Sequence, residues 1–186
     1  MLSITIPDIE LFDESTNSFT YVKGQTICLE HSLVSISKWE STWKEPFLSD
    51  KTKTREQTVD YIKCMTITQN VNPLLYKNLS RKIIERVQNY MNDSMTATWF
   101  SKTENQQQSK GRVITSELIY YWMIEAGIPM ECQKWHINRL MTLIQVCNEE
   151  RKAADPNNKH KMNPRDFAKS RSSLNAQRKA RMHSRG

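Results

Sequence analysis

The sequence predicts a mainly α-helical protein of the α+β class, with a small N-terminal β-hairpin element, a helical body and a basic C-terminal tail that is extended or helical. Three observations support this. Apolar and polar side chains alternate over the first thirty residues, apolar side chains recur every three or four residues over much of the next 120, and Lys and Arg replace apolar residues after residue 150. We therefore expect three parts, residues 1–30, 31–150 and 151–186.

The composition is that of a folded chain. With 186 residues, the chain has the length of one main domain. Apolar residues make up 38% of it and charged residues 25%, which provides enough apolar surface for a core. A wholly disordered protein is therefore not expected.

The first thirty residues have the two-residue period of β-strands. The alternating apolar positions are Leu2, Ile4, Ile6, Ile9, Leu11, Phe19, Tyr21, Ile27 and Leu29. Polar residues interrupt them at 13–18 and again at 23–25, where turns are expected. This pattern predicts short antiparallel strands.

A helical period follows. Apolar residues at spacings of three and four predict a helix from about Ser32 to Trp43, ended near Pro46. Thr54 and Gln57 have the spacing of a capping box and predict the start of a second helix. The middle of the chain is therefore expected to be helical.

Three more helices are expected in the rest of the body. One begins at Pro73, which follows an N-capping Asn, and carries its apolar face to residue 91. Residues 113–126 are apolar on almost every side and predict a central buried helix, ended by Gly127. The helix from residue 129 to 147 should pack against it as an antiparallel hairpin. Residues 101–112 contain no large apolar residue and should form a loop.

The cysteines and histidines do not predict a metal centre. The four cysteines are widely spaced and form no CxxC pair, which favours reduced thiols near the core over a disulfide framework. Cys28 with His31, and Cys132 with His136, each provide two groups that zinc prefers. These residues fall at a strand end and beside a core-facing helical stripe, so a structural role is the stronger interpretation. We predict no metal and no cofactor.

Catalytic motifs are also missing from the sequence. No Cys or Ser lies in a recognisable nucleophile signature, and the glycines at positions 24, 111, 127 and 186 are too far apart for a phosphate-binding loop. Spacing alone does not test a site assembled from distant residues. We predict that the protein is not an enzyme and name no catalytic residue.

The net basic charge is concentrated in the tail. The chain carries a formal +7, but residues 151–186 hold 11 of the 27 basic residues and only 2 of the 20 acidic ones, giving +9. Residues 1–150 hold the other 16 basic and 18 acidic residues, giving −2. Such a tail attracts an acidic protein or the phosphates of a nucleic acid, or it is a solvated extension. With Phe167 as its one aromatic residue, the tail favours a protein partner over nucleic acid.

Candidate partner-binding residues lie in two places. At the end of the first helix, Trp43 is the tryptophan expected to be partly exposed, and Phe47 follows it. In the tail, basic and apolar residues are interleaved, which could recruit a partner on contact. The candidates are Trp43, Phe47, Arg165, Phe167, Lys169, Arg171, Leu174, Arg178, Lys179 and Arg181.

The expected location is the cytoplasm of the cell that makes the protein. Residues 1–6 are followed at once by Pro7 and Asp8, unlike a signal peptide. The longest apolar stretch, residues 118–124, is too short to span a bilayer. No membrane association is expected.

Several stretches of the sequence resemble blocks of the tail assembly chaperones of tailed phages. The blocks are residues 32–41 with Trp43 and Pro46-Phe47, and residues 60–66, 95–100, 114–124, 131–136 and 174–178. Together they extend from about Glu30 to the C-terminus, whereas residues 1–30 match less clearly. The blocks are distinctive strings, not chemical signatures.

This resemblance implies a non-enzymatic assembly factor. Such a protein coats the tape measure protein, prevents its aggregation, recruits tail tube subunits and leaves before the virion is complete. It would act in the host cytoplasm with the tape measure and tail tube proteins as partners, and oligomerisation stays open. The alternative, motivated by the charge of +9 in the tail, is a nucleic-acid-binding or head-to-tail joining structural component of the virion.

Overall fold

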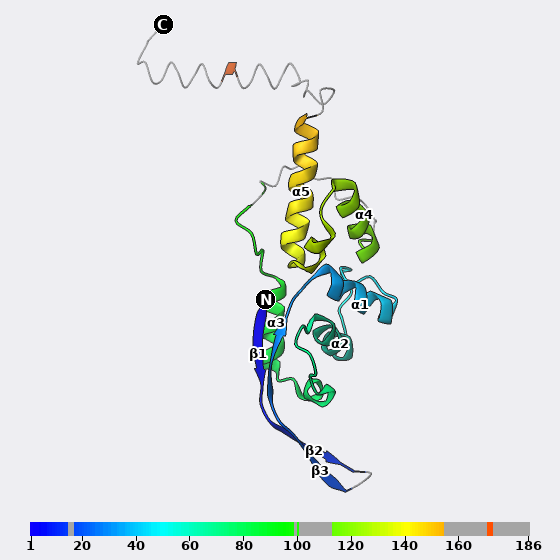
Figure 1. Ribbon diagram of the computed structural model, residues 1–186, viewed down its shortest axis with the longest axis vertical. Coiled ribbons are helices and arrows are strands. Elements are labelled where there is room, and N and C mark those ends of the chain that lie inside the picture. Colours follow the sequence, from blue (N-terminus) through cyan, green and yellow to red (C-terminus); the bar gives the residue numbers. More distant parts are fainter. Residues whose placement is uncertain (15–16, 99, 101–112, 155–170, 173–186) are drawn as a thin grey trace, which may run out of the picture. The chain divides into compact units, whose positions relative to one another are not determined.

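The computed structural model of the chain describes residues 1–14, 17–98, 100, 113–154 and 171–172 (Figure 1). The fold is α+β, with small antiparallel sheets at the N-terminus, as predicted. The chain divides into two units, Met1–Cys147 and Asn148–Gly186. The features below lie in the first unit unless stated. The predicted division at residues 30 and 150 stays a prediction.

The N-terminal strands form two successive antiparallel ladders. The strands are β1 (Leu2–Ile6), β2 (Ile9–Asp13), β3 (Ser18–Val22) and β4 (Gln25–Leu29). β1 pairs with β4, and β2 pairs with β3, so the second ladder continues the first. The predicted strands and the breaks between them are confirmed.

The break between the ladders lies where Gly24 crosses the opposite strand. A Cβ atom at Gly24 would lie 2.4 Å from the carbonyl oxygen of Ile6 and 2.6 Å from the nitrogen of Asp8, so this crossing has room only for glycine. The Asp8 carboxylate accepts hydrogen bonds from Gly24 N–H, at 2.6 Å, and from the Tyr21 hydroxyl. These bonds lower the pKa of Asp8, the Tyr21 bond most of all. They fix the junction between the ladders.

Helices α1 (Leu33–Trp43) and α2 (Arg55–Met65) begin where the sequence predicts. Each has a capping box, formed by Ser32 with Ser35 in α1 and by Thr54 with Gln57 in α2. The two helices pack against each other, and the Trp39 indole N–H donates to the carbonyl of Gln57 at 3.0 Å. Local capping signals therefore set both starting points.

The single helix predicted from Pro73 is wrong. A short 3-10 helix, η1 (Pro73–Asn78), is followed by an extended Leu79, and α3 (Arg81–Met91) starts afresh. Leu79 is buried, and the Ser80 hydroxyl oxygen accepts from Ile83 N–H at 3.3 Å. This second N-cap competes with continuation of the first turn, which explains the break.

The helix predicted from residue 129 is also interrupted. Gly127, at φ +67°, ends α4 (Ser116–Ala126) as predicted. A 3-10 helix, η2 (Met130–Lys134), follows, and α5 (Ile137–Ala154) begins only after an extended Trp135. Residue 136 instead forms a β-bridge with Ser32. A tertiary main-chain contact thus replaces one turn of helix.

α4 is not the fully buried central helix that its composition predicts. Ile119 and Met123 are buried, but Tyr121 is 57% exposed and Ile124 is 69% exposed. The helix packs on α1. The expected antiparallel hairpin of α4 with α5 stays a prediction. Apolar composition alone did not distinguish the core face of α4 from its solvent face.

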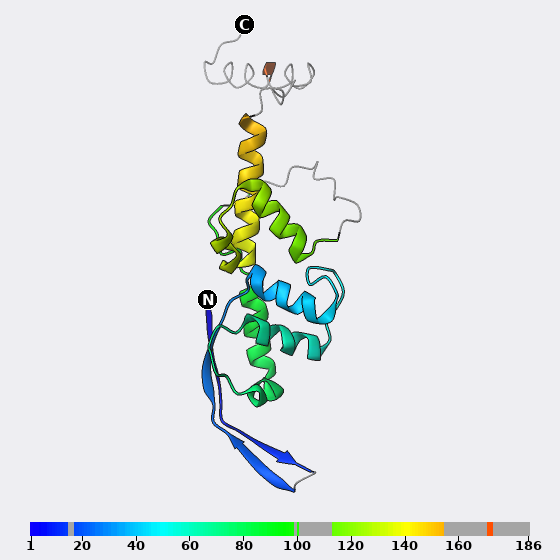
Figure 2. The same ribbon diagram turned by 45° about the vertical axis from the view of Figure 1, so that its right-hand side comes forward.

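One core joins the first ladder to the helices. Its fully buried side chains include Ile4, Ile6, Ile27, Leu29, Leu33, Ile36, Trp39, Ile62, Met65, Leu75, Ile119 and Met123. β1 and β4 thus contribute one face to the same interior as α1, α2 and α4 (Figure 2). Within the described ranges, no helix is long and apolar enough to cross a membrane.

A buried carboxylate links α1 to α4. Glu40 is 8% exposed, and its two oxygens accept main-chain N–H bonds from Phe47 and Ser116, both at 2.8 Å. Thr115, the N-cap residue of α4, makes no side-chain capping bond. Glu40 therefore caps α4 from another helix, and its charge interacts favourably with the helix dipole.

Replacing this carboxylate should destabilise the fold. In Glu40→Gln one carboxylate oxygen becomes an amide NH₂ that faces a main-chain N–H, so we expect unfolding to become about 2 kcal/mol easier. Urea unfolding followed by tryptophan fluorescence would measure this difference. Glu56→Gln, at an exposed carboxylate in the first turn of α2, is the control. Equal unfolding midpoints for the two variants would contradict the capping role.

Candidate partner-binding groove

A groove of about 250 Å³ opens between α2, α3 and the loop after Phe47. Its apolar lining consists of Phe47, Tyr61, Ile62, Ile84, Val87 and Met91. Thr52, Lys53, Thr58 and Gln88 complete the lining with polar groups. The α3 residues recur at spacings of three and four, so one face of that helix forms one wall.

Phe47 lies at the base of this groove and not on the protein surface. Its side chain is 5% exposed, and its ring stacks on Tyr61 with centroids 3.9 Å apart. The ring also meets Trp39 edge to face at 5.1 Å. The structure thus places this candidate residue in the core, where its ring lines the groove.

Lys53 supplies a cation to the groove. Its Nζ atom lies 4.4 Å from the centroid of the Phe47 ring and 5.8 Å from that of Trp39. Burial lowers the pKa of Lys53, while the charge of Glu45 acts in the opposite direction. Sequence reasoning missed this residue, because a single Lys in a polar loop carries no signal of ring contact.

Trp43 is half-buried at the C-terminal end of α1, as predicted. Its indole N–H donates to the Asp60 carboxylate at 3.0 Å, and its ring stacks on Trp39. Trp43 lines a different hollow, which it shares with Val59 and Tyr76. The structure therefore does not bring Trp43 and Phe47 into one site.

The remaining candidates belong to the tail. Arg171 is helical and exposed. The others, Arg165, Phe167, Lys169, Leu174, Arg178, Lys179 and Arg181, lie outside the described residues. Their role in partner binding stays a prediction.

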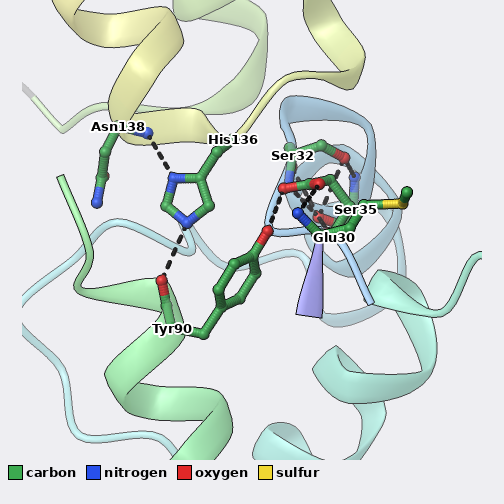
Figure 3. Close-up of polar contacts among 7 residues, drawn as sticks. Glu30, Ser32, Ser35, Tyr90, His136 and Asn138 are labelled. Carbon is green, nitrogen blue, oxygen red and sulfur yellow. Dashed lines mark hydrogen bonds and ion pairs between the residues drawn. The ribbon is translucent and has the colours of Figure 1, made fainter. Parts of the chain in front are cut away.

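A second cluster of polar side chains lies where β4 passes into α1, and Figure 3 shows Glu30, Ser32, Ser35, Tyr90 and His136 from it. We call it the polar junction; its members are Glu30, His31, Ser32, Ser35, Tyr61, Tyr90 and His136. The Tyr90 hydroxyl donates to the Glu30 carboxylate at 2.6 Å. His136 Nε2–H donates to the main-chain carbonyl of Tyr90 at 3.1 Å, and its Nδ1 accepts from Asn138 N–H at 3.3 Å. Each ring nitrogen of the neutral His136 side chain therefore makes a hydrogen bond.

The junction brings together two histidines that are far apart in the sequence. The ring centroids of His31 and His136 lie 5.1 Å apart, edge to face, and His31 Nδ1 is hydrogen-bonded to the Tyr61 hydroxyl. Burial, and then the neighbouring His136, lower the pKa of His31 to about 3. Burial also lowers the pKa of His136, an effect that the hydrogen bond to Tyr90 partly opposes. Both imidazoles are therefore neutral near pH 7.

The polar junction does not have the arrangement of a metal centre or a nucleophile. In the part of the chain that the structure describes, no set of three or more His, Cys, Asp or Glu side chains could hold a metal ion, and the four cysteines are free thiols. Ser35 is buried, and its hydroxyl donates to the Ser32 carbonyl at 2.7 Å. These contacts join secondary-structure elements, so the junction can act as a structural hydrogen-bond network.

Comparisons with protein-family models, curated proteins and solved structures found no match for this chain. Two features of the molecule therefore bear on its function. One is the groove between α2 and α3, and the other is the separation of charge between residues 1–150 and the tail.

The buried histidines should make the fold sensitive to acid. The unfolded chain takes up protons near pH 6.5, whereas folded His31 resists protonation down to about pH 3. Its stabilising contribution is therefore complete above pH 6.5 and is lost as the pH falls through this window, by up to about 1.4 kcal/mol per pH unit. Urea unfolding of wild type and His31→Asn between pH 7.5 and 4.5 would show a smaller slope in the variant.

His183→Asn, in the tail, is the matched control for this measurement. It removes one histidine and leaves the polar junction intact, so its slope should equal that of the wild type. If His31→Asn kept the full slope, His31 would not be the group responsible.

Proposed function

We propose that the protein is a non-enzymatic binding protein, a tail assembly chaperone of a tailed phage, and that the groove between α2 and α3 holds a helix of the tape measure protein. The groove is the observation that carries this proposal. Its apolar residues come from two helices and a loop, and it is open to the surface. Grooves of this kind accept the apolar face of an amphipathic helix.

The size of the groove favours side chains over a whole small molecule. Its volume of about 250 Å³ is below the ~300–1,000 Å³ of small-molecule pockets. A few apolar side chains of a partner helix would fill it, each contributing about 1.5–3 kcal/mol if fully buried. Lys53 beside the groove favours an acidic residue next to them. A helix held by only a few side chains can dissociate again, which suits a protein that must leave its partner.

The basic tail has a separate role in the proposal. Residues 31–150 form the helical body that holds the tape measure protein, and residues 151–186, extended or helical, recruit tail tube subunits through their charge of +9. The protein acts in the host cytoplasm and is absent from the finished virion. The resemblance of residues 32–41, 60–66 and 114–124 to tail assembly chaperones supports the choice of partners.

The charge of the tail also supports a second candidate function. A nucleic-acid-binding or head-to-tail joining component of the virion would use the same Lys and Arg residues on phosphates. Mass spectrometry of purified virions separates the two functions. A joining component is present in a fixed copy number, whereas a chaperone is missing.

A single isoleucine should distinguish groove binding from general stability. Ile83 and Ile84 are neighbouring half-buried residues of α3, and only Ile84 lines the groove. Co-expression with the tape measure protein should keep that protein soluble in the presence of wild type or Ile83→Ser. Ile84→Ser should weaken binding about tenfold, or ~1.4 kcal/mol, because it removes apolar surface from the groove.

Two results of this experiment would count against the proposal. If the tape measure protein precipitated equally with and without the wild-type chain, the chaperone function would fail. If both serine variants lost the same amount of binding, the groove would not be the contact surface. Thermal unfolding of each variant provides the stability reference.

The second candidate function predicts a steep salt dependence. Binding of the full chain to a DNA or RNA duplex should weaken strongly between low and physiological salt if several tail cations contact phosphates. Replacing Arg178, Lys179 and Arg181 together by Glu should reduce both the affinity and the salt slope. Fluorescence anisotropy at several salt concentrations measures both quantities. Binding that is insensitive to salt would exclude this function for the tail.

A further inference from the structure

The outer ladder of the N-terminal hairpin carries an exposed aromatic face. Phe12 lies directly opposite Phe19, with ring centroids 5.0 Å apart, and Tyr21 lies opposite Glu10. Phe12, Phe19 and Tyr21 are 51%, 73% and 61% exposed. Because alternate residues point to the same side of a strand, the three rings and the Glu10 carboxylate share one face of β2 and β3.

Packing against the core does not explain these rings. On the opposite face of the same ladder, Ile9 and Val22 are buried and Leu11 is half-buried. The side chains that this ladder contributes to the core therefore lie on that opposite face. A surface without a partner rarely exposes three large aromatic side chains on one short ladder. These rings therefore indicate an interaction surface.

The same segment is acidic. Residues 8–24 contain four carboxylates, Asp8, Glu10, Asp13 and Glu14, and one cation, Lys23, which gives −3. Residues 1–150 as a whole carry −2, so this segment accounts for the entire negative balance. The opposite charge, +9, is concentrated in residues 151–186 of every copy.

Carboxylates interleaved with aromatic rings suit one type of ligand. Carboxylates pair with Lys and Arg, and ring faces attract the same cations while accepting apolar side chains. The tail contains both components, because Phe167 and Leu174 lie among its cations. A nucleic acid has the wrong charge for this face.

We propose that the aromatic and acidic face of β2 and β3 binds the basic tail, residues 151–186, of a second copy of this chain. Each copy then offers one face and one tail, and the contact is heterologous, so copies associate head to tail. The contact is separate from the groove, and it does not depend on the proposed chaperone function.

Charge reversal on the full chain tests this contact. Glu10, Asp13 and Glu14 replaced together by Lys change the hairpin from −3 to +3. Arg165, Lys169, Arg171, Arg178, Lys179 and Arg181 replaced together by Glu change the tail from +9 to −3. In sedimentation velocity, wild type should associate with rising concentration, and more weakly at high salt.

Each reversed variant alone should self-associate at least about tenfold more weakly, since it places like charges on both surfaces. An equimolar mixture of the two should associate again, because the native tail of one variant meets the native hairpin of the other, and the reversed hairpin meets the reversed tail. This recovery requires contact between different molecules. A general loss of folding cannot produce it.

Two controls separate the face from net charge. Asp50, Glu56 and Glu131 are exposed carboxylates outside the hairpin, and their joint replacement by Lys makes the same change of charge. That variant should associate as wild type does. Phe19→Ser leaves the charge unchanged and should still weaken association severalfold, because it removes an exposed ring.

The proposal is overturned by any of four results. They are a wild-type chain that stays monomeric at all concentrations, association that neither reversal weakens, a mixture that fails to recover, and association that disappears on nuclease treatment. A salt-sensitive change of shape that does not depend on concentration would place the contact within one chain, and would also overturn it.

Discussion

The main-chain hydrogen bonds of residues 28–31 position the elements of the first unit. Cys28 accepts from Ile67 N–H at 2.8 Å, and Glu30 N–H donates to the Met65 carbonyl at 2.9 Å, so this segment holds the end of α2. The carbonyl of His31 accepts from Ile137 N–H at 2.7 Å and thereby fixes the start of α5. One short stretch thus satisfies groups that two helix ends would otherwise leave unpaired.

Side chains strengthen the same arrangement from within. Glu30 and His136 each bond to Tyr90, which ties α3 to the segment, and Tyr61 does the same for α2. Of the buried side-chain polar atoms in the described chain, Ser116 Oγ alone has no hydrogen-bond partner. A buried network with so few unmet groups favours one packing over its alternatives. Because it fixes α2 and α3, it also fixes the two walls of the groove.

Features of the fold set by neighbouring residues could be predicted from the sequence. The alternation of the strands, the capping box of Thr54 with Gln57 and the stop at Gly127 each depend on a few adjacent positions. The breaks at Leu79 and Trp135 could not be predicted, because they depend on burial and on a bridge to a residue more than 100 positions away. The apolar face of α3 was predicted, whereas the groove also needed the loop that carries Phe47 and Lys53. Contacts outside the periodic pattern of the sequence decide such loops, including the hydrogen bond that Phe47 N–H donates to the Glu40 carboxylate.

The crossing at Gly24 also determines which way the aromatic rings point. β4 buries the odd-numbered Ile27 and Leu29, whereas β3 buries the even-numbered Val22, so the phase of burial reverses between them. The same reversal separates Ile4 and Ile6 from Ile9. Without this reversal, the odd-numbered Phe19 and Tyr21 would point to the same buried side as Ile27 and Leu29 of β4. The parity change at a single glycine thus converts what would be additional core into an outward-facing aromatic surface.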